Sequence, residues 1–281
     1  MSTDICERAE AFKALHLREK AFVLPNPWDT GSTKMLTALG FEALATTSAG
    51  FAFSTGKGTS IGEIGREEAL DHAAGIIAAT PLPVSADLEN GYGHSPEEVA
   101  ETVRLAAEIG LAGCTIEDAT GDPDSPIYER AHAIERIAAA AEVVRGLDRP
   151  FMLTARAENY LFNRPDFDDT LMRLQCYEMV GADVLYAPAL PDLEAIKTVC
   201  QEVSKPVNVV AGIGLPGVTI AELEAAGVKR ISVGSAFARV AYGAMISAAR
   251  EILDTGSFAP FQSAASFSSI EALIKSVDLE Q

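Results

Sequence analysis

The chain has 281 residues, of which 48% are apolar and 22% are charged, and its formal net charge is −18. This length is close to the roughly 250 residues of one α/β barrel, and the composition is that of a globular protein with a sizeable core. Nucleic-acid backbones are bound by clustered Lys and Arg side chains, so the acidic balance argues against a nucleic-acid partner. It does not exclude an anionic substrate, because a metal ion or an arginine sets the local field inside a pocket.

The spacing of the cysteines and the lack of long apolar runs indicate in which cellular compartment the protein is expected. Four cysteines form no C-x-x-C pair: Cys6, Cys114, Cys176 and Cys200. Such usage is typical of a reducing compartment. The first residues lack the basic-then-apolar pattern of a signal peptide, and no apolar run approaches the roughly 18 residues of a membrane span. We therefore expect a cytoplasmic protein without a membrane partner.

Short β-type runs alternate with longer helical stretches along the whole chain. Eight runs are predicted to be strands: Phe22–Leu24, Ala43–Thr47, Pro83–Asp87, Gly113–Glu117, Phe151–Ala155, Ala182–Tyr186, Val207–Val210 and Arg230–Val233. Several are continuously apolar, as expected for parallel strands that are covered on both faces. A strictly alternating series permits an open doubly wound sheet or a closed barrel, and eight units in one chain favour a (β/α)8 TIM barrel.

The helical stretches carry recognisable end signals. Ser95-Pro96-Glu97-Glu98 forms a capping box with proline at the first helical position, and Gly110 ends this helix. Further helices are predicted at Ala133–Val144, Asp169–Val180, Ile220–Ala226, Ala241–Leu253 and Ser268–Val277. Residues 50–58 are predicted to form a flexible, glycine-rich loop at the mouth of the second strand.

The C-terminal part of the chain departs from this alternation. Gly256 and Pro260 interrupt the pattern, and Phe258, Phe261 and Phe267 are more aromatic residues than a disordered tail carries. We expect a single domain over residues 1–281. Within it, residues 254–281 form a helical extension that packs on the barrel or on a neighbouring subunit.

Charged residues end or follow three consecutive strands. Asp87 ends the third strand and Glu89 follows it, Glu117 ends the fourth, and Arg156 and Glu158 follow the fifth. Active sites of β/α barrels form at these carboxyl ends. Carboxylates gathered there repel one another unless a cation bridges them, and hard oxygen ligands favour Mg²⁺, with Mn²⁺ also possible. The alternative is that each acid caps the next helix or pairs with Arg156.

Five stretches carry a family resemblance: Thr47-Ser48-Ala49-Gly50, Asp87-Leu-Glu89-Asn-Gly-Tyr-Gly93, Ile116-Glu117-Asp118, Ala155-Arg156-Ala-Glu158 and Val207-Asn208-Val-Val-Ala-Gly212. With them, the chain resembles the isocitrate lyase and phosphoenolpyruvate mutase superfamily from Pro25 to about Leu253. The likeness extends to its phosphoenolpyruvate phosphonomutase-like and oxaloacetate decarboxylase-like members. The acid-x-acid-x-Gly-Tyr-Gly motif together with Ile-Glu-Asp is its most specific part.

The resemblance implies a Mg²⁺ site, held partly through waters, with three ligands: Asp87, Glu89 and Glu117. It also implies a binding site for a small oxo acid: Ser48, Ala49, Gly50, Arg156 and Asn208. Members of this family cleave or form a C–C or P–C bond next to an enolpyruvate, where a metal and an arginine stabilise the developing enolate charge. The family also exchanges its eighth barrel helix between subunits, which predicts a homodimer or homotetramer.

The loop after the fourth strand departs from the family. Isocitrate and methylisocitrate lyases carry a Lys-Lys-Cys-Gly-His motif there, and phosphonomutases use lysine and asparagine. Here Ala119–Arg130 contains neither lysine nor cysteine. Isocitrate cleavage and P–C chemistry both lose support. Tyr92, Glu158 and Lys57 are candidate acid–base replacements, although Glu158 would serve equally as a partner for Arg156.

The predicted function is a Mg²⁺-dependent lyase. It would cleave a C–C bond of a small 2-oxo or 2-hydroxy dicarboxylic acid, or decarboxylate it, through an enolpyruvate-type intermediate. Four residues are predicted to be catalytic: Tyr92, Glu117, Arg156 and Glu158. Two alternatives stay open, namely a mutase or hydrolase acting on the P–C bond of a phosphonopyruvate-like substrate, and an oxo-acid-binding barrel with little turnover.

Overall fold

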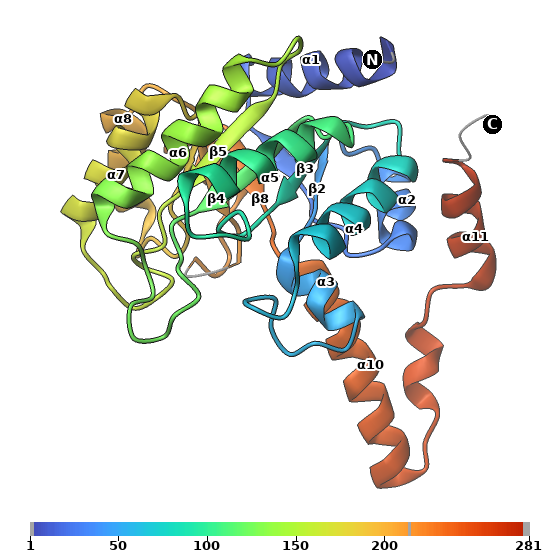
Figure 1. The fold of residues 1–281 in the computed structure, drawn as a ribbon. Coiled ribbons are helices and arrows are strands. Elements are labelled where there is room, and N and C mark those ends of the chain that lie inside the picture. Colours follow the sequence, from blue (N-terminus) through green and yellow to red (C-terminus); the bar gives the residue numbers. More distant parts are fainter. Residues whose placement is uncertain (1–2, 213–214, 278–281) are drawn as a thin grey trace.

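The computed structural model describes residues 3–212 and 215–277, and its centre is a sheet of eight parallel strands (Figure 1). The strands are β1 (Phe22–Leu24), β2 (Leu44–Ala45), β3 (Val84–Asp87), β4 (Gly113–Glu117), β5 (Met152–Arg156), β6 (Val184–Tyr186), β7 (Val207–Val210) and β8 (Arg230–Ser232). Their order is β1-β8-β7-β6-β5-β4-β3-β2. Between the two end strands the Ala45 N–H donates to the Pro25 carbonyl over 3.0 Å, which brings the sheet round into a nearly closed barrel. The predicted (β/α)8 TIM barrel is confirmed.

The α-helices alternate with the strands, and most of them cover the outside of the barrel. They are α1 (Thr3–Leu17), α2 (Thr30–Ala38), α3 (Ser48–Ser54), α4 (Arg66–Ala78), α5 (Pro96–Glu108), α6 (Arg130–Arg145), α7 (Phe167–Val180), α8 (Leu193–Glu202), α9 (Ile220–Ala225), α10 (Ala236–Thr255) and α11 (Phe267–Lys275). The predicted capping box of α5 is present: the Glu98 N–H donates to Ser95 Oγ over 3.2 Å, and the Ser95 N–H donates to Glu98 Oε2 over 2.9 Å. None of the helices in the described ranges is long and apolar enough to cross a bilayer.

Helix α1 precedes the first strand and covers the amino-terminal ends of the strands. Its Phe12 is fully buried and packs in one cluster with Phe22 and Leu24 of β1 and with Met152 at the start of β5. The carboxyl-terminal ends of the strands lie at the opposite side of the barrel. The predicted catalytic residues therefore lie on the side that α1 does not cover.

The segment after β2 differs from the prediction of a flexible loop over residues 50–58. Helix α3 begins at Ser48, and Thr47 caps it by accepting the Gly50 N–H at Oγ1 over 3.3 Å. The loop prediction is therefore wrong as far as Ser54. A hydroxyl that accepts the N–H three residues later is a common start of a helix, and it allowed a short helix in a glycine-containing stretch.

The chain after β8 leaves the barrel. Helix α10 projects away from it (Figure 1). Ala238 is the only buried residue of this helix. The chain turns at Gly256, where φ is 74°, and returns through a 3₁₀ helix (Ala259–Ser263). Helix α11 then packs against α2.

Candidate active site

Parallel register brings Asp87, Glu117 and Arg156 together at the ends of β3, β4 and β5. Glu117 lies opposite Arg156, and Asp87 lies opposite Thr115 of the neighbouring strand. Arg156 Nη1 is 3.1 Å from Glu117 Oε2 and 4.0 Å from Asp87 Oδ1. One guanidinium thus lies between two of the predicted metal ligands.

Glu158 is the direct ion-pair partner of Arg156. It is fully buried, and its Oε1 contacts Arg156 Nε. The guanidinium also lies over the ring of Tyr186, 5.0 Å from its centroid. The pairing role for Glu158 is confirmed. A carboxylate on one edge and an aromatic face beneath fix the orientation of Arg156.

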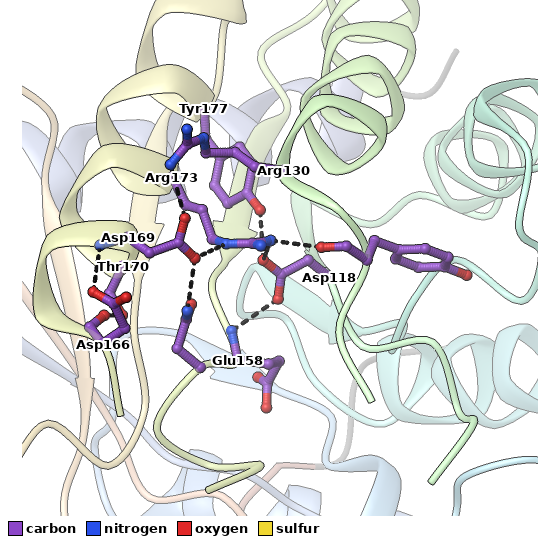
Figure 2. A network of polar contacts seen from close by, with 10 residues as sticks. Asp118, Arg130, Glu158, Asp166, Asp169, Thr170, Arg173 and Tyr177 are labelled. Atoms are coloured by element: carbon purple, nitrogen blue, oxygen red, sulfur yellow. Dashed lines mark hydrogen bonds and ion pairs between the residues drawn. The ribbon is translucent and has the colours of Figure 1, made fainter. Parts of the chain in front are cut away.

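A second network of polar contacts holds the backbone of Glu158 (Figure 2). The Glu158 N–H donates to Asp118 Oδ1 over 2.8 Å, and Asp118 Oδ2 accepts from Tyr177 Oη over 2.6 Å and from Arg173 Nη1 over 2.9 Å. Arg173 Nε in turn pairs with Asp169 over 2.7 Å. Asp118 therefore connects the end of β4 to α7 and fixes the backbone that carries Glu158.

Glu89 reaches the site through a strained turn after β3. Glu89 and Tyr92 have φ values of 50° and 56°, in the left-handed region that non-glycine residues seldom adopt. The Glu117 N–H donates to the Glu89 carbonyl over 2.9 Å, and Asn90 Oδ1 accepts the Tyr92 N–H over 3.0 Å. This turn places the Glu89 carboxylate beside Glu117, since both side chains line the same cavities.

Burial makes this group of carboxylates hard to ionise. It raises the pKa of Glu89 to about 7, and it raises the pKa of Glu117 well above the ordinary value although Arg156 opposes the shift. Burial likewise raises the pKa of Glu158 to about 7 against the pull of Arg156. A single arginine does not balance the carboxylates around it, so the site favours a further cation.

The donor atoms fit a hard divalent cation that keeps part of its water shell. Asp87 Oδ1 and Glu89 Oε1 are buried and accept no hydrogen bond. In the described parts of the chain, no three His, Cys, Asp or Glu side chains are placed to hold one ion together. Direct ligation by Asp87, Glu89 and Glu117 at once is therefore not the geometry present. Mg²⁺ usually binds through one or two carboxylates and several waters, which agrees with the expectation that this site is partly water-mediated.

The predicted carboxylate-binding segment divides into two half-buried residues and one buried residue. Ser48 donates to Asp87 Oδ2 from Oγ over 2.8 Å and from its N–H over 3.2 Å. Ser48 and Ala49 line a cavity of about 260 Å³. Gly50 is buried behind them, where an added Cβ would lie 2.6 Å from Thr47 Cγ2. Its small size is needed for packing, and it does not line the cavity.

Asn208 lies deeper, in the interior of the barrel. It is 1% exposed, donates to Ser232 Oγ over 3.1 Å and accepts from Arg230 Nε over 2.8 Å. It lines a separate cavity of about 60 Å³ that also borders Asp87 and Arg156. Asn208 is thus placed beneath the carboxylate group and not among the residues of the larger cavities.

Two larger cavities meet at Glu89 and Glu117. The cavity of about 260 Å³ has apolar walls from four side chains: Phe53, Ile61, Leu161 and Phe162. The neighbouring cavity, of about 600 Å³, is lined in part by Tyr92, Arg66 and His94. Together they provide space for a small acid at the carboxylates and for a substituent beyond it.

The candidate acid–base residues differ in position. Tyr92 Oη is buried without a hydrogen-bond partner, and burial next to Glu89 raises the pKa of Tyr92 well above its ordinary value. Lys57 instead pairs with Glu68 over 2.6 Å. It lines neither of the cavities that border Glu89, so its proposed acid–base role loses its geometric basis.

Sequence reasoning missed two arginines near the site. Arg66 lines the larger cavity from the start of α4, and Arg230 is buried at the start of β8. A charged residue opening an otherwise apolar strand was the available signal for Arg230. Arg66 gave no such signal, because it opens an amphipathic helix where arginine is common.

The comparisons with known proteins agree with this geometry. Residues 12–253 match the profile of the phosphoenolpyruvate phosphomutase family. The crystal structure of a provisionally assigned lyase/mutase from Burkholderia cenocepacia J2315 is 53% identical, covers 96% of both chains and has a TM-score of 0.93.

Two curated proteins extend the likeness across most of the chain. An uncharacterised protein of Mycobacterium tuberculosis (strain ATCC 25618 / H37Rv) is 32% identical over 247 residues, which cover 87% of this chain and 89% of that protein. The 2,3-dimethylmalate lyase of Eubacterium barkeri is 27% identical over 246 residues, 85% of this chain and 83% of that protein. The chain therefore belongs to the phosphoenolpyruvate phosphomutase family and is an enzyme of the isocitrate lyase/phosphoenolpyruvate mutase type.

Proposed function

We propose that the protein is a Mg²⁺-dependent lyase that breaks a C–C bond of a small 2-oxo or 2-hydroxy dicarboxylic acid, or decarboxylates it, through an enolpyruvate-type intermediate. The observation that carries the proposal is the group of buried carboxylates around Arg156, at the meeting of two cavities. One oxygen of Asp87 and one of Glu89 are buried there without accepting a hydrogen bond. Related proteins named 2,3-dimethylmalate lyase, 2-methylisocitrate lyase and oxaloacetate decarboxylase support this reaction class.

Asp87, Glu89 and Glu117 would hold the ion, partly through waters that bridge the carboxylates to it. When bound, Mg²⁺ supplies Lewis-acid stabilisation of the negative charge that develops on an enolate oxygen. Mn²⁺ has a similar preference for these oxygen donors. Asp87 is positioned by two bonds from Ser48 and by its own N–H, which donates to Thr46 Oγ1 over 3.0 Å.

Arg156, which lines the cavity of about 260 Å³, would bind the carboxylate or enolate oxygen of the substrate. Its Nε is held by Glu158 and its face by Tyr186, so its Nη atoms are already oriented before substrate binds. Ser48 and the backbone of Ala49 would contact the substrate carboxylate. Asn208 would lie beneath the substrate, where its hydrogen bonds with Arg230 and Ser232 hold its side chain in place.

Tyr92 is the proposed proton donor to the enolate carbon. Its hydroxyl is protonated at neutral pH, and burial raises its pKa further above the ordinary value. The hydroxyl has no competing hydrogen-bond partner. Its left-handed backbone conformation places the ring next to Glu89 and along the wall of the larger cavity. A positioned acid of this kind contributes about 10²–10⁴-fold to the rate in enzymes.

The assembly is proposed to be a homodimer or homotetramer in which the C-terminal segment is exchanged between subunits. Five side chains of α10 are apolar and solvent-exposed in the single chain: Phe237, Val240, Met245, Ile246 and Leu253. A soluble protein seldom leaves such a row uncovered. A second copy of the chain is the occupant that the family resemblance implies.

An assay with purified protein tests the proposed reaction. The protein is incubated with Mg²⁺ and a panel of 2-oxo acids, 2-hydroxy dicarboxylates and phosphonates, and pyruvate, CO₂ and phosphate are measured. The lyase predicts pyruvate or CO₂ release that stops with excess chelator. Phosphate release would indicate P–C chemistry, and binding without product would indicate an oxo-acid-binding protein.

Variants of the carboxylates identify the metal site. Asp87→Asn and Glu117→Gln are each expected to lower kcat by at least about 100-fold, because each removes a charged oxygen that positions the cation. Glu7→Gln, on the exposed surface of α1, is the matched control and should retain the wild-type rate. Near wild-type turnover in either site variant would show that these carboxylates do not hold the metal.

A further inference from the structure

Arg230 is a buried cation without a charged partner. It is 2% exposed in the interior of the barrel, and its Nε donates to Asn208 Oδ1 over 2.8 Å. Its Nη1 is buried and has no hydrogen-bond partner. Among the residues that the structure describes, no carboxylate forms an ion pair with it.

The other buried arginines of the chain are all better satisfied. Arg156 and Arg173 contact carboxylates, while Arg136 and Arg149 donate to two or more backbone carbonyls. Burial lowers the pKa of Arg230 to about 10, so the guanidinium still carries its charge at neutral pH. An unpaired buried charge is strongly unfavourable unless a partner supplies the opposite charge.

A small cavity lies beside this guanidinium. Its volume is about 60 Å³, and its polar lining includes Arg230, Arg156, Asn208, Ser232, Tyr186 and Asp87. The volume exceeds the roughly 10–15 Å³ that one water molecule requires, so a single small ion fits. The Ser232 hydroxyl accepts from Asn208 and keeps its own proton to donate.

The charges around the cavity favour an anion. Arg156 is already paired with Glu158 and Glu117, and the Asp87 oxygens are directed at Ser48 and Arg156. Among the described residues that line the cavity, Arg230 is therefore the cation without a carboxylate partner. An unpaired cation beside a buried polar cavity attracts a monovalent anion more strongly than it attracts water. The negative charge of Asp87 places such an anion on the Arg230 side.

We propose that this cavity is a binding site for one small monovalent anion, which pairs with Arg230 Nη1 and the Ser232 hydroxyl. The anion is a free halide or the carboxylate of an organic acid, and both present the same charge to the guanidinium. The site would complete the ion pairing of the barrel interior beneath the substrate cavity. It requires neither the metal nor turnover.

Bromide is the probe, because it scatters anomalously and is close to chloride in size. Crystals of the wild-type protein grown in sodium gluconate are transferred to sodium bromide at equal ionic strength. We expect an anomalous peak between Arg230 Nη1 and Ser232 Oγ. A second crystal with bromide and oxalate distinguishes the sources: a retained peak identifies a halide site, and a peak replaced by oxalate identifies a carboxylate site.

Thermal unfolding gives an independent readout in solution. Above the dissociation constant, the wild-type Tm should rise by roughly 2–5 °C for each tenfold increase in bromide at constant ionic strength. Arg230→Met should lose this dependence while remaining folded, because methionine replaces the buried charge with an apolar side chain of similar length. Arg149→Met, at a buried arginine that donates to carbonyls, is the control and should keep the bromide dependence.

Water alone in the cavity, together with equal bromide responses of the wild type and Arg230→Met, would overturn the proposal. If Arg230→Met does not fold, Ser232→Ala takes its place and is expected to weaken the bromide response. The bromide measurements involve no substrate, so a failed lyase assay leaves them unaffected. Conversely, an empty cavity would leave the lyase proposal standing.

Discussion

His16 lies beneath the barrel, where its ring packs edge-on against Phe12 and Phe22. One ring nitrogen, Nδ1, is 2.8 Å from the Phe12 carbonyl, and Nε2 has no partner. Burial, with a smaller contribution from the Arg230 charge, lowers the pKa of His16 to about 3. The histidine is therefore neutral in the folded protein at every pH where the enzyme is expected to work.

This burial predicts acid sensitivity. Below pH 6.5 the unfolded chain binds a proton at His16 that the folded chain does not, so stability is lost as pH falls from about 6.5 to about 3. Between pH 7.5 and 5.0 this one residue should remove about 2 kcal/mol from the free energy of unfolding. Urea denaturation at both pH values measures it, and His16→Leu should reduce the loss by that amount.

His132→Gln is the control for the histidine prediction. The His132 side chain is 38% exposed, and its contact with Glu135 is a long one of 3.7 Å. It should lose stability between the two pH values as the wild type does. An unchanged pH response in His16→Leu would show that acid sensitivity arises elsewhere in the molecule.

Residues of the active site differ in how far sequence reasoning reached them. Asp87, Glu117 and Arg156 could be placed together because parallel strands bring their carboxyl ends to one edge of a barrel. The burial of Gly50 and the pairing of Lys57 with Glu68 could not be predicted. Side-chain direction at those positions depends on α3 and α4, and their contacts come from tertiary packing.

At the scale of elements, Asp118 connects β4, β5 and α7. Its carboxylate accepts from the Glu158 N–H, Arg173 and Tyr177, and it is 3% exposed (Figure 2). Nothing in the Ile-Glu-Asp motif distinguishes a metal ligand from a structural acid. Successive residues at the end of a strand point in different directions, so Glu117 faces the cavity while Asp118 faces α7.

Asp118→Asn is expected to destabilise the fold and slow the reaction. Removing one partner of a buried ion pair destabilises proteins by about 3–5 kcal/mol, because the remaining arginine stays buried. Loss of the bond to the Glu158 N–H should also lower kcat more than it changes KM, since Glu158 orients Arg156. Urea denaturation and steady-state kinetics measure the two effects.

Asp169→Asn is the matched control for this network. Asp169 also pairs with Arg173, over 2.7 Å, but its side chain is 24% exposed. Its replacement should reduce stability by less than that of Asp118, and kcat should stay close to the wild-type value. A wild-type kcat in Asp118→Asn would contradict the positioning role, and an unchanged urea midpoint would contradict the structural one.

The whole molecule has an uneven surface. The barrel helices pack against the sheet, whereas α10 projects outward (Figure 1). Apolar side chains of α10 and of the segment after it are exposed. Leu253 is 84% exposed, Met245 is 60% exposed and Phe267 is 84% exposed. A helix that buries only Ala238 in its own chain is expected to be stabilised by another subunit.

Charged substitutions on this helix test the assembly. The wild type should sediment as a dimer or tetramer at micromolar concentration. Met245→Asp with Leu253→Asp should shift it toward the monomer, because a buried unpaired carboxylate opposes association. Leu17→Asp, at a residue of α1 that is 74% exposed, is the control and should leave the mass unchanged. A monomeric wild type would contradict subunit exchange.

The sequence by itself determined the alternation of eight strands with helices, and therefore the barrel. Hydrophobic runs, capping boxes and glycine stops are local signals, and β4 and β7 have the predicted bounds, Gly113–Glu117 and Val207–Val210. It also placed the acidic residues at one end of the strands, because that position follows from strand order alone.

Only the tertiary structure decided which acid holds Arg156, which carboxylate oxygens are left without partners, and that Arg230 is buried beneath them. These properties depend on contacts between residues far apart in the chain, such as Glu158 with Asp118 and Arg230 with Asn208. Burial sets the charge of a titratable group, and the depth of burial is a property of the packed molecule and not of the local sequence.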